Sequence, residues 1–208
     1  MKKVLLAGVI ALGVMSQAAM AAGDAAAGKA KTAACAACHG PDGNSAAPTF
    51  PKLAGQGERY LIKQLQDIKS KVRPVPAMMG LLDNFNNQDF ADMAAYFSSQ
   101  KGSVSQAKKD LVTKGEQIYR AGVKDRGIPA CTACHSPSGS GNPPAGFPRL
   151  SGQHADYIAT QLKAYRAAAD GDAAGRSNDG DTKPMRAIAA HLTDSEIAAV
   201  SSYVSGLH

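Results

Sequence analysis

Bulky side chains are scarce in this sequence. Its 208 residues include no tryptophan, five phenylalanines and six tyrosines, against 21 glycines and 11 prolines. So few aromatic groups leave little material to fill the cores of two small domains. Because hydrophobic residues still make up 44% of the chain and charged residues 19%, the composition is not that of a disordered protein. We therefore expect a folded chain in which something other than aromatic side chains fills the interior.

A hydrophobic run long enough to cross a membrane is also missing. The apolar stretch at residues 4–14 is well short of the about 20 residues that a spanning helix needs. It follows a lysine pair, and Ala19 and Ala21 occupy the two positions that a signal peptidase reads. We therefore predict a signal peptide at residues 1–21 that is cleaved to release a soluble, exported chain.

Dense clusters of positive charge are missing too, although the formal net charge is +6. Basic residues are scattered, and the longest run after the signal peptide is the pair Lys108-Lys109. A nucleic-acid surface needs a concentrated basic patch or stripe. We therefore expect no nucleic-acid partner.

The remaining sequence contains one pattern twice. Cys-Ala-Ala-Cys-His at residues 35–39 recurs as Cys-Thr-Ala-Cys-His at residues 131–135, and these motifs use all four cysteines of the chain. Phe-Pro-Lys-Leu-Ala-Gly-Gln at residues 50–56 recurs as Phe-Pro-Arg-Leu-Ser-Gly-Gln at residues 147–153. A repeat this long and ordered indicates two homologous domains.

The end of each copy defines the domain limits. The closing Tyr-x-Ser motif recurs after 107 residues, whereas the preceding segment recurs after 97, so the second copy contains an insertion near residues 167–182. We predict an N-terminal domain at residues 22–103 and a C-terminal domain at residues 104–208. A polar linker near residues 100–109 is expected to join them.

The periodicity of apolar residues is helical. It predicts a helix over residues 59–71 and a second helix that begins near Tyr157. Thr193 followed by Glu196 forms a capping box, which predicts the start of a closing helix. Because no segment shows a convincing strand alternation, we expect an all-α fold.

Two thiols three positions apart beside an imidazole carry specific chemistry. Each thiol can add to a vinyl group of one haem, and the adjacent histidine is then held beneath the ring as an iron ligand. Covalent attachment lets a small domain wrap the ring with few aromatic side chains. The pattern therefore predicts two haem c groups, attached through Cys35 and Cys38 and through Cys131 and Cys134.

Cysteine chemistry allows two other interpretations. An exported chain can form disulfides, but a Cys-x-x-Cys disulfide closes a tiny loop and is usually redox-active, and the βαβ surroundings of that chemistry are absent. A zinc site could combine both motifs, although a histidine directly after each second cysteine is unusual for zinc.

The repeat also selects a second axial ligand. The second copy contains one methionine, Met185, and Met78 holds the equivalent position in the first. Met79 and Met93 have no methionine counterpart, and the first copy has no second histidine, which excludes bis-histidine ligation within it. The predicted iron ligands are His39 and Met78 in the first domain, and His135 and Met185 in the second.

The spacing between each histidine and a later proline predicts a hydrogen bond for the imidazole nitrogen that does not bind iron. Pro51 lies twelve residues after His39, and Pro148 lies thirteen after His135, so each proline carbonyl could accept the imidazole N–H. A proline that only shapes a loop fits the same spacing. Neutral thioether ligands favour Fe(II), so both centres are expected to have fairly high potentials.

In their order and spacing, these motifs resemble the class I c-type cytochromes in tandem, dihaem form, over residues 22–208. The resemblance implies two tandem cytochrome c domains, each wrapped around one covalently attached haem, with propionates facing the domain interface. It implies a periplasmic carrier, soluble or peripherally membrane-associated, that takes electrons from a respiratory quinol-oxidising complex to a haem-copper terminal oxidase. Redox proteins would be its partners, with no small-molecule substrate. Its haem-binding residues would be Cys35, Cys38, His39, Met78, Pro51, Cys131, Cys134, His135, Met185 and Pro148.

Enzyme and sensor functions are the alternatives. A dihaem oxidoreductase, such as a peroxidase or a sulfur-compound dehydrogenase subunit, needs an iron with an open or exchangeable position, as does a gas or redox sensor. Here Met78 and Met185 would occupy the sixth position of each iron. The two repeats account for the predicted mature chain and leave no catalytic domain, so we expect an electron carrier that is not an enzyme.

Two features depart from the family pattern. The N-terminal helix of such domains pairs a small residue with an aromatic one four positions on, which Gly115 and Tyr119 satisfy, whereas Gly28 is followed by Thr32. The resemblance therefore leaves the packing of the first helix open. The acidic spacing of the loop at residues 170–181 resembles that of a calcium loop, but Ala174 replaces one expected ligand and no terminal glutamate follows, so we expect a flexible, solvated loop.

Overall fold

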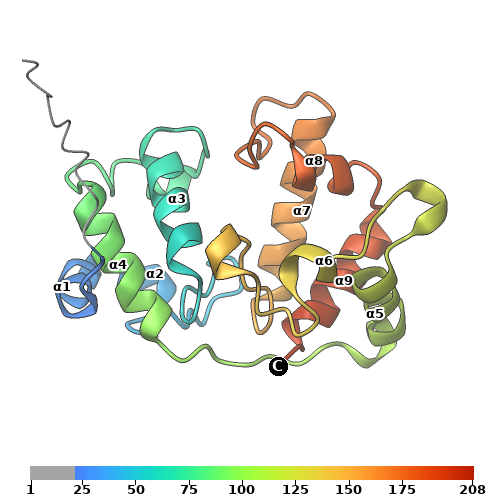
Figure 1. Cartoon of the computed structure of the whole chain (residues 1–208), viewed down its shortest axis with the longest axis horizontal. Helices are drawn as coiled ribbons and strands as arrows, with labels where there is room; N and C mark the ends of the chain where they lie inside the picture. The colour runs from blue at the N-terminus through green and yellow to red at the C-terminus, as the bar shows by residue number, and fades with distance from the viewer. Residues whose placement is uncertain (1–21) are drawn as a thin grey trace, which may run out of the picture.

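A computed structural model describes residues 22–208, so the predicted signal peptide lies outside the described residues. Within this range the chain is helical and forms no strand; two isolated bridges, Val123 with Ile128 and Asn142 with Phe147, are its β pairings. This confirms the all-α prediction. No helix in the described part is long and apolar enough to cross a membrane. The helices gather in two groups that lie side by side (Figure 1).

The first group belongs to the first domain, for which we keep the predicted limits of residues 22–103. Its elements are α1 (Ala25–Lys31), η1 (Ala33–Cys35), α2 (Ala36–His39), α3 (Glu58–Lys69), η2 (Pro76–Met78) and α4 (Asn87–Ser99). α4 is buried along most of its length and packs against both α1 and α3. The short α2 contains Cys38 and His39 of the first Cys-x-x-Cys-His motif, and Cys35 ends η1 directly before it.

The second group, within the predicted limits of residues 104–208, has a similar arrangement. Its elements are η3 (Lys109–Leu111), α5 (Val112–Ala121), η4 (Lys124–Arg126), α6 (Thr132–His135), η5 (Pro143–Ala145), α7 (Ala155–Ala169), α8 (Pro184–Ala189) and α9 (Asp194–Ser205). α9 packs against α5 and α7, and α8 packs against α7. The core contains Ile118, Tyr119, Leu162, Ile197 and Val204.

A glycine allows the first and last helices of each domain to cross closely. A Cβ atom at Gly28 would lie 2.0 Å from the carbonyl oxygen of Asp92, and one at Gly115 would lie 2.3 Å from that of Ala199. α1 therefore packs against α4 as α5 packs against α9, although Thr32 replaces the aromatic residue. The structure thus settles the packing that the sequence left open.

Local signals place the ends of the longer helices. The predicted capping box is confirmed, because Thr193 Oγ1 accepts the N–H of Glu196 and the Glu196 carboxylate accepts that of Thr193. α3 ends two residues earlier than predicted, since Lys71 adopts a left-handed conformation with φ of 64°.

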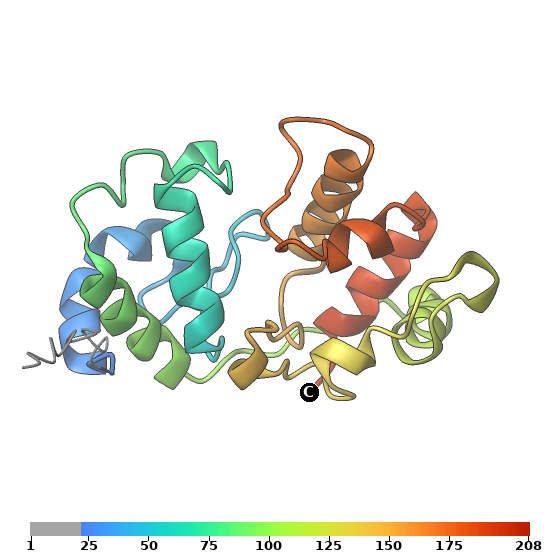
Figure 2. The same cartoon turned by 45° about the horizontal axis from the view of Figure 1, so that its top comes forward.

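The inserted loop differs from its prediction. Residues 171–174 are exposed, but Arg176 and Asn178 are 7% and 5% exposed. The prediction of a solvated loop is therefore wrong for its second half, because these polar side chains find hydrogen-bond partners on the first domain. Figure 2 shows the loop before α8 facing the other group of helices, while residues 101–108 connect the domains along one edge.

Candidate functional site

Each Cys-x-x-Cys-His motif folds into a single short turn of helix, α2 or α6. Cys35, Cys131 and Cys134 are partly buried, and Cys38 is exposed. Before any haem is attached, burial raises the pKa of the Cys35 thiol and raises that of the Cys131 thiol to about 11. Within residues 22–208 no group of three or more histidine, cysteine, aspartate or glutamate side chains is placed to hold a metal ion.

The two histidines of these motifs are held in the same way. His39 Nδ1 lies 2.9 Å from the carbonyl oxygen of Pro51, and His135 Nδ1 lies 3.0 Å from that of Pro148. Because a carbonyl oxygen can only accept, Nδ1 carries the proton, and Nε2 keeps its lone pair. Of the two interpretations of these prolines, the structure shows the hydrogen bond.

Burial keeps both imidazoles neutral. His39 and His135 are 8% and 7% exposed. Burial lowers the pKa of each below its ordinary value of 6.5, although the hydrogen bond to proline opposes this shift. A neutral imidazole with a fixed ring and a free Nε2 is what a metal ion requires of a histidine ligand.

The methionines occupy different environments. Met78 lies in η2 and lines a hollow with Ile68 and Leu82, and Met185 lies in the first turn of α8, where it packs against the core of the second domain. Met93 is 1% exposed within α4 and belongs to the core, whereas Met79 is 71% exposed.

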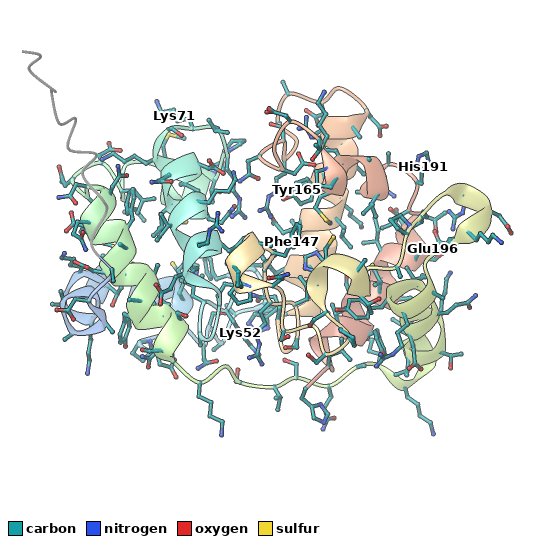
Figure 3. The ribbon with its side chains drawn as sticks, viewed as in Figure 1. Lys52, Lys71, Phe147, Tyr165, His191 and Glu196 are labelled. Atoms are coloured by element: carbon teal, nitrogen blue, oxygen red, sulfur yellow. The ribbon has the colours of Figure 1, made fainter. Side chains whose placement is uncertain are left out.

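Equivalent residues join the two domains. Gln56 Oε1 accepts the backbone N–H of Arg149 at 2.7 Å, and its Nε2 donates to the Arg149 carbonyl at 3.0 Å. Gln153 pairs with Lys52 in the same manner, with both distances 2.8 Å. Lys52 lies toward the centre of the molecule in Figure 3. Each domain thus offers the other the same donor and acceptor pair.

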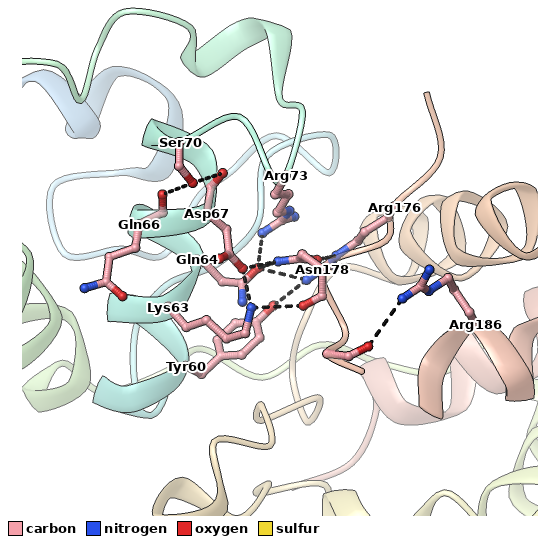
Figure 4. Close-up of polar contacts among 11 residues, drawn as sticks. Tyr60, Lys63, Gln64, Gln66, Asp67, Ser70, Arg73, Arg176, Asn178 and Arg186 are labelled. Carbon is pink, nitrogen blue, oxygen red and sulfur yellow. Dashed lines mark hydrogen bonds and ion pairs between the residues drawn. The ribbon is translucent and has the colours of Figure 1, made fainter. Parts of the chain in front are cut away.

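Two buried arginines lie between α3 and α7 (Figure 4). Arg73 donates to Tyr157 Oη at 2.9 Å and to Gln161 Oε1 at 3.0 Å, both in α7. Arg176 donates to Gln64 Oε1 in α3, also at 3.0 Å. They are 8% and 7% exposed, and neither forms an ion pair with any residue of the described chain. Buried cations without a carboxylate partner are costly, so the donor set suits an anionic ligand.

These arrangements fit a haem in each domain. The thiols and the neutral imidazole lie on one helical turn, and the unbalanced guanidinium groups suit its propionate carboxylates. Sequence reasoning did not identify Arg73 and Arg176. The recurrence of tyrosine and glutamine at 60 and 64, and again at 157 and 161, was the available signal of a shared interface.

Comparisons with known proteins agree with this site. The family described as Cytochrome c matches residues 25–101 and 112–208. The chain is 57% identical to cytochrome c4 of Azotobacter vinelandii, with all of both chains covered. It is 56% identical to the crystal structure of reduced recombinant cytochrome c4 from Pseudomonas stutzeri, with a TM-score of 0.85 and coverage of 90% and 100%. It is also 35% identical to a thiosulfate dehydrogenase electron acceptor of Stutzerimonas stutzeri, over 97% of this chain and 94% of that protein.

Proposed function

The chain belongs to the cytochrome c family, and we propose that it carries electrons in the periplasm from a respiratory quinol-oxidising complex to a haem-copper terminal oxidase. Its two cytochrome c domains bind two covalently attached haem c groups and transfer electrons. The donor, the acceptor and the compartment are the proposed part. Their support is the 57% identity over the full length of a cytochrome c4.

We assign the haem-binding roles residue by residue. Haem supplies an iron that gains or loses one electron. Cys35 and Cys38 would hold the first group and Cys131 and Cys134 the second. The proposed axial ligands are His39 with Met78 and His135 with Met185.

The observation that carries this proposal is the matched pair of imidazoles. In each domain a proline carbonyl holds Nδ1–H, and burial keeps the ring neutral, so that Nε2 presents a lone pair in a fixed direction. A rigid ligand changes little between oxidation states, which favours fast electron exchange over substrate binding. The chain itself would therefore be a carrier and not a catalyst.

Carbon monoxide distinguishes a carrier from an enzyme. We expect two haems per chain and no change in the reduced absorption spectrum when the gas is added, because methionine closes both irons. Ready binding at one haem would contradict the carrier proposal and favour a peroxidase or a sensor, which needs an open position.

A second candidate concerns the electron donor. The 35% identity to a thiosulfate dehydrogenase electron acceptor favours a carrier that receives electrons from oxidation of a sulfur compound. Stopped-flow mixing of the oxidised protein with a quinol-oxidising complex, and separately with a thiosulfate dehydrogenase, compares the two donors. If the dehydrogenase reduces the protein faster than the quinol-oxidising complex does, the proposed donor is wrong.

A further inference from the structure

The end of the inserted loop touches both domains. Asn178 Nδ2 donates to Asp67 Oδ2 at 2.7 Å and to Gln64 Oε1 at 3.0 Å, both in α3 of the first domain. Lys63, one turn earlier in α3, donates to the backbone carbonyl of Asn178 at 3.0 Å. Three hydrogen bonds thus fix one loop residue to the opposite domain (Figure 4).

The next residue is fixed to α8 of its own domain. Asp179 Oδ2 accepts the backbone N–H of Arg186 at 2.9 Å, and Oδ1 accepts its Nε–H at 2.6 Å. The Asp179 carboxylate is 2% exposed. Lys183, which precedes α8, provides no side-chain cap, so Asp179 supplies an acceptor for a free N–H of the first turn.

Met185 is the sequence neighbour of Arg186, which Asp179 holds. It precedes Arg186 in the first turn of α8, and its side chain packs on the domain core. The path from the first domain to Met185 therefore consists of Asn178, Asp179 and Arg186, each joined to the next by a peptide bond or by a nearly buried ion pair. Such a path has little freedom to bend, because both of its ends are hydrogen-bonded.

The first domain lacks a matching path. The counterpart of Arg186 is Met79, which is 71% exposed and cannot form an ion pair. The counterpart of Asp67 in α7 is Ala164. Although the glutamine–backbone hydrogen bonds of the interface are reciprocal, this connection runs in one direction only.

We infer that Asn178 and Asp179 are positioning residues through which contact with α3 of the first domain holds Met185 against the second haem. The inference rests on the proposed function, in which Met185 ligates that iron. Outer-shell groups of this kind typically change metal-site affinity about 10–100-fold when they are removed. The second haem should accordingly bind added ligands more readily when the path is cut.

The first test compares Asp179→Asn with Asp181→Asn, which makes the same charge change on an exposed side chain of the same loop. Imidazole is titrated into the oxidised protein, and the weak absorption band of the sulfur–iron bond is followed. We expect Asp179→Asn to raise imidazole affinity at one haem about tenfold. An affinity equal to that of Asp181→Asn would overturn the inference.

The second test cuts the path at the other domain. Asn178→Ala removes the two side-chain hydrogen bonds to Gln64 and Asp67 of α3, and Ser177→Ala changes the exposed neighbour as a control. Asp67→Asn alters the path from within the first domain. Both Asn178→Ala and Asp67→Asn should raise imidazole affinity at the second haem alone; a response at the first haem, or none, would contradict the inference. If Asp179→Asn folds poorly, Asn178→Ala and Asp67→Asn still test the inference.

Reference variants assign each response to a haem. Met78→Ala and Met185→Ala give the spectra expected when one sulfur–iron bond is lost. If Met185→Ala leaves the band intact, the ligand assignment of the proposed function fails. If it removes half of the band while Asp179→Asn has no effect, only the positioning inference fails.

Discussion

At the scale of single residues, each of the two imidazoles is held so that its Nε2 atom can bind one metal ion. The proline carbonyls at 2.9 and 3.0 Å fix the tautomer and the ring plane, and burial keeps the rings neutral. The two sulfur atoms differ more, because Met185 belongs to a helix packed on the core and Met78 to a short 3₁₀ turn in a loop. The histidine side of each site is thus shared, while the methionine side is specific to its domain.

Replacing Met185 with alanine should open one iron and leave the other closed. We expect carbon monoxide to bind one of the two haems. The reduction potential of that haem should also fall, because a neutral sulfur ligand that favours Fe(II) is lost. Redox titration with and without the gas provides the measurement.

Met93→Ala is the informative control for this variant. Its side chain is 1% exposed in α4, so its loss should reduce stability by about 2–5 kcal/mol through the cavity that it leaves. Both irons should nevertheless remain closed to carbon monoxide. Gas binding in Met93→Ala would mean that weakened packing alone opens a haem.

At the scale of elements, the start of α9 combines two stabilising features. The capping box of Thr193 and Glu196 satisfies free N–H groups, and the Glu196 carboxylate also pairs with Arg126 of η4. That pair joins the loop before α6 to the closing helix. The carboxylate therefore supports both the helix and the path of the chain toward the second haem motif.

Glu196→Gln should lose stability in a pH-dependent manner. The hydrogen bond from Arg126, opposed by burial and aided by the contacts with Thr193, lowers the pKa of Glu196 from 4.5 to about 2. A lowered pKa in the folded state stabilises the protein above the unfolded value, and this stability is lost as the pH falls from 4.5 toward 2. We expect a cost of about 1 kcal/mol at pH 7 that shrinks across this window.

Chemical denaturation at a series of pH values tests this expectation. Asp125→Asn, on an exposed side chain of the same 3₁₀ turn as Arg126, is the matched charge control. An unfolding difference that is the same at pH 7 and pH 3 would mean that the cap, and not the charge of Glu196, supplies the stability.

Helices whose position depends on residues close together in the sequence were predictable. The capping box specified the start of α9, and the apolar face of residues 59–71 specified α3 to within two residues at its end. The buried part of the inserted loop was not predictable, because Arg176 and Asn178 have the composition of a solvated segment. Their burial depends on partners in α3 that lie more than 100 residues earlier in the sequence.

At the scale of the whole molecule, the repeated sequence produces a nearly two-fold interface. Gln56 and Gln153 exchange backbone hydrogen bonds, and Arg73 and Arg176 exchange side-chain contacts with the opposite domain. The repeat predicted two similar domains but not their contacts, since each copy alone gives no indication that its glutamine binds the backbone of the other.

Removing the glutamine pairs should uncouple the domains. Gln56→Ala and Gln153→Ala together delete four hydrogen bonds between them. Each hydrogen bond contributes about 0.5–1.5 kcal/mol, so we expect the double variant to unfold in two separate thermal transitions. Calorimetry with Gln106→Ala, an exposed linker residue, as control makes the comparison. One unchanged transition in the double variant would show that other contacts couple the domains.

Because the linker at residues 101–108 joins the two domains, it changes how the rate of electron exchange between them depends on concentration. Two separate one-haem proteins would exchange electrons at a rate proportional to their concentrations, whereas joined domains meet at an effective concentration on the order of 1 mM. Exchange between the two haems is therefore a first-order event. Its rate therefore stays the same however dilute the protein becomes.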